Sequence, residues 1–262
     1  MAKLEKKLET KTALVTGAAR RIGRAIALAL AADGWRVAVH YQNSEKDARA
    51  TVADIRAENG IAEAVQADLA DAASCGALIA RAADVLGPVS CLVNNASLFE
   101  NDRMTDFTRE SMGATLEVNL IAPALLTQAL ARQLPKGAQG NVINILDQRV
   151  WRLTPRYLSY TLSKSALWTL TRTMAMALAP VIRVNGIGPG PTLPNDHQDA
   201  AQFARQAGST ILRRGAGLDE IAAAARFILA SPSMTGQMIA LDGGQHLGWA
   251  QPEHGNRFPP DE

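Results

Sequence analysis

Two side chains in the second half of the sequence could together transfer a proton. Tyr160 and Lys164 lie four residues apart in "YTLSK", within a stretch expected to be helical, so both project from one helix face. A phenol ordinarily ionises at about pH 10, and a neighbouring ammonium group favours the phenolate. We therefore expect Lys164 to lower the pKa of Tyr160, which would then act as a general acid. On its own, this spacing is also typical of a solvated helix face.

An aspartate lies thirteen residues before the tyrosine. Asp147 directly follows the apolar run 141–146, where a strand is expected to end. A carboxyl group at such a place can bring or relay a proton. The alternative is that Asp147 simply belongs to a surface turn, but its register with Tyr160 favours catalysis.

The stretch "TGAARRIGRAIA" has the pattern of a phosphate-binding turn. Gly17 would permit a tight turn, and Gly23 would let the following helix pack closely against the preceding strand. The N-terminus of that helix offers free N–H groups and a positive dipole to a pyrophosphate. Arg20 and Arg21 lie between the glycines, where guanidinium groups can pair with phosphate oxygens. The alternative is an ordinary strand-to-helix turn.

The next expected strand end favours NADP(H) over NAD(H). A site for the ribose 2′-hydroxyl would have Asp or Glu at this place, whereas no acid occurs before Glu45. Because no carboxylate would repel a 2′-phosphate, we expect the nearby polar residues to bind it. These residues are Arg20, His40, Asn43 and Ser44, with Tyr41 beside them. Their alternative role is to cap the next helix.

Strands and helices that alternate along the chain must position these residues. The expected strands are 12–16, 36–40, 62–68, 90–95, 141–146, 182–188 and 237–241. The expected helices are 22–33, 45–58, 71–86, 109–133, 157–179 and 218–230. Strands that are apolar with little alternation are typical of a sheet covered on both faces. The pattern predicts an α/β fold, a Rossmann-type doubly wound parallel sheet of about seven strands with helices on both faces.

We expect one domain over residues 11–250, between an N-terminal extension (1–10) and a C-terminal tail (251–262). The stretch 188–210 is expected to be irregular and follows the carboxyl end of a strand. Its central part, 191–209, is therefore a candidate substrate lid. We expect His197 and His246 to have no catalytic role.

The composition excludes several classes of protein. Of the 262 residues, 47% are hydrophobic and 20% are charged, which argues against disorder. A net charge of +2 is too small to indicate a nucleic-acid partner. Cys75 and Cys91 match no metal motif, so we expect no metal and a reduced, cytoplasmic location. We find no run of eighteen apolar residues and no signal peptide, and so expect a small-molecule substrate rather than a membrane partner.

Several of these motifs, taken in order along the chain, resemble the short-chain dehydrogenase/reductase family. They are "TGAARRIG", "NNAS", Asn119 in "EVNLIAP", "YTLSK" and "VNGIGPG". The match runs from about residue 10 to 250, nearly the whole chain. The resemblance implies a Rossmann-type fold, usually a homotetramer, and hydride transfer between a nicotinamide and a carbonyl-like centre.

The resemblance also implies roles for individual residues. Tyr160 would donate the proton, Lys164 would hold the nicotinamide ribose and tune Tyr160, and Asn119 would anchor a water in the proton relay. Asp68, with Leu69, would meet the adenine. The other residues implied to contact the cofactor are Gly17, Arg20, Arg21, Ile22, Gly23, Asn95, Ala96, Ser97, Pro189 and Gly190.

Two departures from the family pattern resemble one subgroup, the pteridine reductases. Asp147 replaces the usual catalytic serine, and Arg21 replaces the middle glycine of the turn. The resemblance extends to "VHYQNS", "VQADL" and "LVNNASLF". It implies NADPH-dependent reduction of a dihydropterin, in which Tyr160 and Asp147 together would supply the proton. Arg21 would touch both the cofactor phosphates and the pterin, Phe99 would stack on the pterin, and Ser97 would bond to its polar edge.

Two other functions remain open. A carbonyl reductase, for instance of 3-oxoacyl thioesters, would keep Tyr160 and Lys164 but would not need Asp147. A non-enzymatic NADP(H) sensor would not need Tyr160 at all. The complete set of Tyr160, Lys164 and Asn119 favours an enzyme. For Phe99, the alternative to stacking on a ligand is a core aromatic at the start of a loop.

Overall fold

A seven-stranded parallel sheet forms the centre of the structure, a computed structural model that describes residues 11–194 and 198–248. The strand order is β3-β2-β1-β4-β5-β6-β7. The strands are β1 (Thr12–Val15), β2 (Arg36–Tyr41), β3 (Ala62–Gln66), β4 (Cys91–Asn94), β5 (Gly140–Ile145), β6 (Ile182–Pro189) and β7 (Met238–Leu241). The expected extension 1–10, tail 251–262 and His197 lie outside the described residues.

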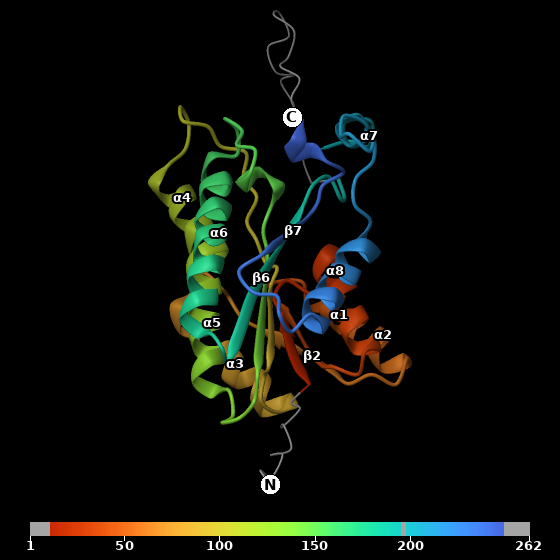
Figure 1. Cartoon of the computed structure of the whole chain (residues 1–262), viewed down its shortest axis with the longest axis vertical. Helices are drawn as coiled ribbons and strands as arrows, with labels where there is room; N and C mark the ends of the chain where they lie inside the picture. Colours follow the sequence, from red (N-terminus) through yellow and green to blue (C-terminus); the bar gives the residue numbers. More distant parts are fainter. Residues whose placement is uncertain (1–10, 195–197, 249–262) are drawn as a thin grey trace, which may run out of the picture.

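Helices cover both faces of the sheet, which confirms the predicted doubly wound fold (Figure 1). One face carries α1 (Arg21–Ala32), α2 (Glu45–Ala57) and α8 (Leu218–Ala230). The other carries α3 (Ala72–Leu86), α4 (Arg109–Leu116), α5 (Ala122–Gln133) and α6 (Leu158–Leu178). A further helix, α7 (Ala200–Gly208), lies beyond the carboxyl ends of the strands.

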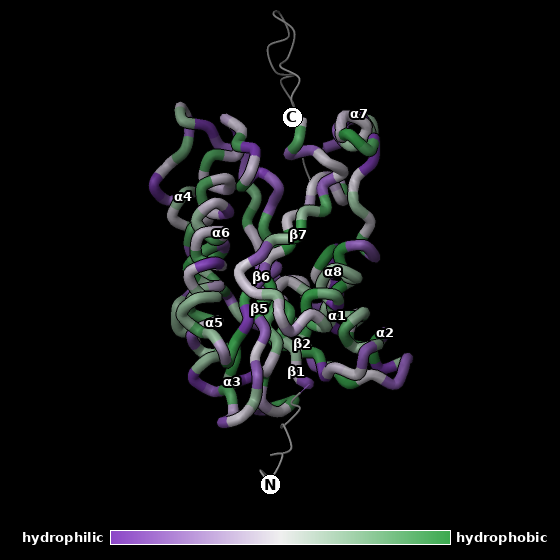
Figure 2. The backbone as a smooth tube through the Cα atoms, in the orientation of Figure 1, coloured by the Kyte–Doolittle hydropathy of each residue, from purple (hydrophilic) through white to green (hydrophobic). Residues whose placement is uncertain are grey.

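The alternation of side chains along the central strands produces two cores, one on each face. Val15 and Val39 pack in the core that contains Ile26 of α1. Leu14 points the other way and packs with Leu126 of α5. Because both faces are covered, the central strands are mostly apolar, and β1 is completely buried. Figure 2 shows hydrophobic stretches on the helices of both layers.

The strand order reverses between β1 and β4. After β1 the chain builds the sheet outward through β2 and β3, and it then crosses to β4 on the other side of β1. The loops that leave β1 and β4 therefore diverge at their carboxyl ends, where ligands bind in sheets of this kind. The glycine turn follows β1, and Asn95 directly follows β4.

The predicted helix 109–133 is interrupted. A π-helical turn, η1 (Glu117–Ile121), separates α4 from α5. By length and composition alone, this run is the one helix within the described residues that could cross a membrane. In the fold, its side chains Leu126 and Leu130 are fully buried in the core.

The prediction that 188–210 is irregular is wrong in part. Strand β6 continues to Pro189 because it pairs with β7 as far as Leu241. Within the predicted lid, α7 begins at Ala200 after a capping box in which Asp199 accepts a hydrogen bond from the Gln202 N–H. A capping box of this kind stabilises a helix start, so the part of this segment from Ala200 to Gly208 is a short helix.

Candidate active site

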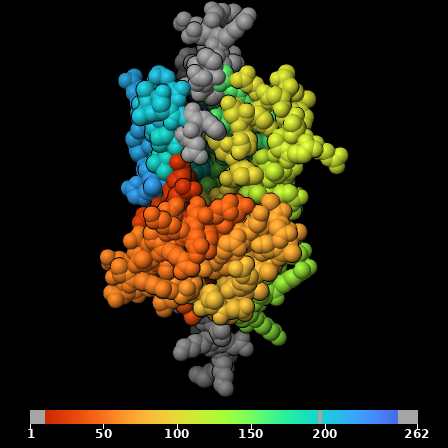
Figure 3. Space-filling view, turned by 180° about the vertical axis from the view of Figure 1, so that it is seen from behind, coloured from red at the N-terminus to blue at the C-terminus, as the bar shows by residue number. Residues whose placement is uncertain are grey.

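The carboxyl edge of the sheet is hollowed, and the hollow lies between the segments around α1, α4 and α7 (Figure 3). It consists of two adjoining cavities. The glycine-turn cavity measures about 510 Å³ and is lined by Gly17, Arg20–Gly23, His40–Ser44, Asp68, Leu69 and Asn95–Ser97, among others. The tyrosine cavity measures about 730 Å³ and is lined by Phe99, Asp147–Arg149, Tyr160, Lys164, Pro189 and Gly190, among others. Arg20, Arg21, Ile22, Asn95 and Ser97 border both.

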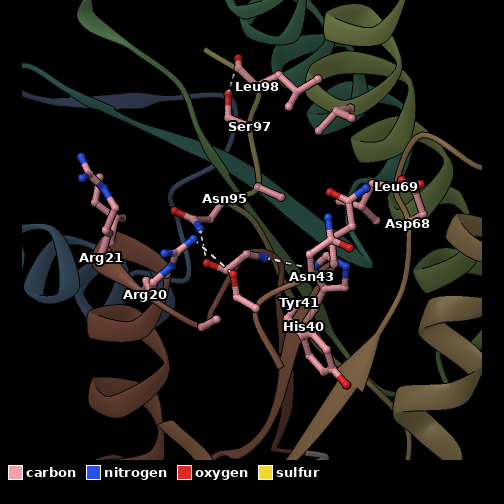
Figure 4. Close-up of a pocket in the computed structure, with 18 residues that line it drawn as sticks. Arg20, Arg21, His40, Tyr41, Asn43, Asp68, Leu69, Asn95, Ser97 and Leu98 are labelled. Atoms are coloured by element: carbon pink, nitrogen blue, oxygen red, sulfur yellow. Dashed lines mark hydrogen bonds between the residues drawn. The ribbon is translucent and has the colours of Figure 1, made fainter. Parts of the chain in front are cut away.

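The glycine turn has the bare backbone that the sequence predicts. Gly17 has a φ of +61°, a conformation that L side chains rarely adopt. A Cβ at Gly23 would clash with the Gly17 carbonyl and lie 2.5 Å from Asn95 Nδ2. Asn95 Nδ2 itself donates hydrogen bonds to the carbonyls of Thr16 (2.8 Å) and Gly17 (3.1 Å). The turn is thus fixed to the end of β4 and leaves an open cradle at the N-terminus of α1 (Figure 4).

His40 supports the turn rather than reaching the cavity as a cation. Its Nδ1 accepts a hydrogen bond from the Gly17 N–H (3.0 Å), and Nε2 lies 3.2 Å from the Ala67 carbonyl. Burial lowers the pKa of His40 to about 4, so the ring is neutral at pH 7 and carries its proton on Nε2. The expectation that His40 helps to hold a phosphate is therefore wrong, because both ring nitrogens already have partners.

Arg20 and Ser44 lie side by side in the wall of the glycine-turn cavity. Arg20 Nη2 donates to Ser44 Oγ at 3.2 Å, and Arg20 Nε lies 3.6 Å from Asp47. The Arg20 side chain is 66% exposed, so its guanidinium remains accessible to an anion. Asn43 lines the same cavity, and Asp68 with Leu69 lies across it (Figure 4).

Arg21 has the backbone conformation of a glycine. Its φ is +54°, in the left-handed region, which explains why glycine is an alternative residue at this position. Its guanidinium donates hydrogen bonds to the carbonyls of Pro194 (2.8 Å) and Leu193 (3.4 Å). Arg21 therefore connects the first loop of the fold to the segment that follows β6, and it borders both cavities.

Tyr160 and Asp147 form a hydrogen-bonded pair in the tyrosine cavity. The Tyr160 hydroxyl donates to Asp147 Oδ2 at 2.8 Å. Asp147 lies two residues after β5 and caps the short helix η2 (Gln148–Val150), because its Oδ1 accepts from the Arg149 N–H at 2.8 Å. Lys164 Nζ lies 5.6 Å from the centre of the Tyr160 ring and donates to the Ile145 carbonyl at 2.8 Å.

The ionisation of these groups differs from the expectation. Burial, together with the charge and hydrogen bond of Asp147, raises the pKa of Tyr160 well above its ordinary value. The predicted lowering by Lys164 is wrong, since Lys164 is turned to a backbone carbonyl and the nearest charge is an anion. Burial raises the pKa of Asp147, an effect that Arg149 opposes, and lowers the pKa of Lys164 to about 8. The pair therefore binds protons more tightly than either group would in water.

Asn119 lies in the π-helical turn and is directed at a loop. Its Oδ1 accepts from the Leu98 N–H (2.8 Å), and its Nδ2 donates to the Leu98 carbonyl (2.9 Å). Nδ2 also donates to Ser163 Oγ on α6 (3.0 Å). The buried amide thus holds the loop after β4 beside the helix that carries Tyr160.

Sequence comparison agrees with this geometry. The family model described as enoyl-(acyl carrier protein) reductase matches residues 17–246. The chain belongs to the short-chain dehydrogenase/reductase family. Members of this family are oxidoreductases that use NAD(P)H.

Three members of the family are similar over almost their whole length. FolM alternative dihydrofolate reductase 1 of Brucella suis, solved in complex with NADP, is 46% identical, with a TM-score of 0.90 over 92% of this chain and 97% of that one. Pteridine reductase 1 of Leishmania tarentolae is 33% identical over 90% of this chain and 96% of its own. A 3-oxoacyl-[acyl-carrier-protein] reductase of Synechocystis is 34% identical over 90% of this chain and 97% of its own.

In this short-chain dehydrogenase/reductase, an aromatic cluster of Phe99 and Tyr157 lies beside the hydrogen-bonded pair of Tyr160 and Asp147, and the sequence predicted only Phe99 at the site. Phe99 stacks on Tyr157, with ring centres 4.3 Å apart, and meets the Tyr160 ring edge-on at 4.6 Å. One face of Phe99 is thus occupied by Tyr157, and a planar ligand would have to use the other. Arg149, also missed, lies 4.7 Å from the centre of the Tyr157 ring. Tyr157 and Arg149 belong to none of the motifs above, and only the folded loops bring them to Phe99.

Proposed function

We propose that the protein is an NADP(H)-dependent reductase whose substrates are dihydropterins, a class that includes dihydrofolate. The hydrogen bond between the Tyr160 phenol and the Asp147 carboxylate carries this proposal, because a carboxyl group can relay a proton whereas a serine in its place can only bind an oxygen. The similarity to the Brucella dihydrofolate reductase and the Leishmania pteridine reductase supports the same class.

The residues of the glycine-turn cavity fit a dinucleotide. Gly17 and Gly23 line this cavity with bare backbone, and the N-terminus of α1 beside them suits a pyrophosphate. Arg20, Asn43 and Ser44 would hold a 2′-phosphate, and no carboxylate follows β2 directly to repel it. When bound, NADPH would supply the hydride for the reaction.

The residues of the tyrosine cavity would supply the proton. The Tyr160 hydroxyl would pass its proton to the nitrogen of a ring C=N bond, and Asp147 would return a proton to Tyr160 through their hydrogen bond. The raised pKa of Asp147 suits this role, because a carboxyl group must be protonated to donate. Lys164, with a pKa of about 8, would be mainly cationic at neutral pH and able to hold ribose hydroxyls.

Assembly as a homotetramer and a cytoplasmic location stay predictions. The first follows from the family resemblance, and the second from the two cysteines, which are free and buried. Size-exclusion chromatography with light scattering would measure the number of subunits directly.

Steady-state assays would test the proposed reaction. The purified protein should oxidise NADPH, and NADH more slowly, in the presence of dihydrobiopterin or dihydrofolate. Turnover of a 3-oxoacyl thioester without turnover of either dihydropterin would contradict the proposal. That second candidate, a 3-oxoacyl thioester reductase, is supported by the similarity to the Synechocystis enzyme.

Replacement of Asp147 separates the two candidates. We expect Asp147→Ser to lower kcat for a dihydropterin by on the order of 10²-fold, because the proton relay is lost. Asp147→Asn, which keeps the size and polarity, should lose as much. A 3-oxoacyl thioester reductase should instead retain its activity with serine at this position, since a serine is the usual residue of the family there.

A further inference from the structure

The wall of the tyrosine cavity contains a cation that the proposed reaction does not use. Arg149 lies two residues after Asp147, and its side chain is only 14% exposed. Its Nε is 3.9 Å from Asp147 Oδ1, and among the described residues Asp147 is the acidic group with which it pairs. A guanidinium removed from water to this extent needs a compensating charge nearby.

The two oxygens of Asp147 have different partners. Oδ2 accepts the hydrogen bond of the Tyr160 hydroxyl, whereas Oδ1 accepts that of the Arg149 N–H and faces the guanidinium. The carboxylate therefore lies between the phenol and the guanidinium. Any change in the charge of Arg149 must act on the proton that Asp147 and Tyr160 share.

The Arg149 guanidinium is held in place by its neighbours. It lies over the Tyr157 ring at 4.7 Å and over the Phe99 ring at 5.6 Å, both within the range of cation–π attraction. Its Nη1 donates to Thr154 Oγ1 at 3.2 Å. These contacts hold the charge next to Asp147 and limit its freedom to swing toward a ligand.

The other charged groups around this cavity are engaged elsewhere or exposed. Lys164 on α6 donates to the Ile145 carbonyl. At the start of α1, Arg20 donates to Ser44, and Arg21 donates to the carbonyls of Leu193 and Pro194. Glu100 after β4 is exposed, and His246 on η3 (Gln245–Leu247) pairs with Asp242. Arg149 opposes the effect of burial on the pKa of Asp147 more than Lys164 does, and it also lowers the pKa of Tyr160.

We propose that Arg149 is a positioning residue for proton transfer, which acts through Asp147: it holds the carboxylate against Tyr160 and sets the pH range in which the pair can donate. The inference rests on the proposed function of Tyr160 and Asp147. Removal of the guanidinium should leave Asp147 protonated to a higher pH. Because reduction needs the protonated carboxyl group, the fall of activity on the alkaline side should move upward.

Tyrosine NMR can test this role without relying on turnover. The chain contains three tyrosines, so labelling at Cζ gives three signals, and Tyr160→Phe identifies the one of interest. In the full-length protein, the Tyr160 signal should show a pH-dependent step as Asp147 titrates, and Asp147→Asn should abolish it. We expect Arg149→Gln to move this step up by about one pH unit, because the variant removes a positive charge that lies a few ångströms from the Asp147 carboxylate and lowers its pKa.

Arg149→Lys is the matched control that keeps the charge, and its step should stay near that of the wild type. The alkaline limit of dihydropterin reduction should move in Arg149→Gln by the same amount as the NMR step, with NADPH affinity unchanged. Arg149→Met keeps the apolar stem over Tyr157 and serves if the glutamine variant does not fold.

A step that stays in place while the melting temperature falls would show that Arg149 only packs, and it would overturn the proposal. If the wild-type protein reduces no dihydropterin, the proposed substrate fails, but the position of the NMR step still decides the role of Arg149.

Discussion

The glycine turn and the Asp147–Tyr160 pair lie on two sides of one crevice and treat buried polar groups differently. Around the turn, polar groups are neutral and satisfied by the backbone: His40 bonds to Gly17 and Ala67, and Asn95 bonds to Thr16. In the tyrosine cavity, ionisable groups are buried against one another, and burial shifts their pKa values. The glycine turn thus fixes the backbone in shape (the shape-building region), and the tyrosine cavity holds protons on its ionisable groups (the proton-holding region).

The largest effect should come from the proton-holding region. Tyr160→Phe removes the hydroxyl but keeps the ring that packs edge-on against Phe99. We expect kcat to fall on the order of 10³-fold, within the range typical of general acid catalysis. NADPH affinity, measured by fluorescence titration, should change little because the turn is untouched. Weaker NADPH binding with an unchanged kcat would show that the two regions do not have these separate roles.

A pH-dependent effect on stability should come from His40 in the shape-building region. Its folded pKa is about 4, below its ordinary value of 6.5. Between these values the unfolded chain takes up a proton that the folded chain does not, so stability is lost as the pH falls from about 6.5 to 4. The shift corresponds to about 3 kcal/mol.

The matched variant for this experiment is His40→Gln, which does not titrate. Urea unfolding at several pH values should show the wild type losing stability relative to the variant as the pH drops toward 4. Stability curves that run parallel between pH 7 and pH 4 would mean that His40 is protonated in the folded state, contrary to its two backbone partners.

A smaller loss of stability should follow Gly23→Ala. The added methyl group would meet the Gly17 carbonyl and the Ala18 Cα, which are backbone atoms and cannot easily move. We expect a cost of about 2 kcal/mol in unfolding free energy and weaker NADPH binding. Gly76→Ala is the control, because Gly76 lies on the exposed face of α3 with open space at its Cβ, where alanine should stabilise by up to about 1 kcal/mol. Equal effects at both positions would contradict the close packing of the turn.

The same division explains what could be predicted from the sequence. Backbone shape leaves local traces: Gly17 and Gly23 mark the turn, and apolar runs mark the strands and most of the helices. These features depend on a few neighbouring residues, so a pattern can reveal them. The i, i+4 spacing likewise brought Tyr160 and Lys164 to one cavity with Asp147.

The direction of the Tyr160 pKa shift could not be predicted in this way. It depends on complete burial and on which charge lies nearest, and both are set by loops distant in sequence. Arg149 and Tyr157 were missed for the same reason, since their contacts with Phe99 form only in the folded chain. His40 was misassigned because its position near the end of β2 gives no information about its two backbone partners.

The π-helical turn at Glu117–Ile121 has a consequence for the length of this helix. Such a turn uses one residue more than an α-helical turn. Loss of a single residue here would restore the regular winding and rotate α4 by about 100° relative to α5. The Asn119 amide would then leave Leu98, and the loop that carries Phe99 would be released. We therefore expect this helix to tolerate substitutions better than an insertion or deletion between 117 and 121.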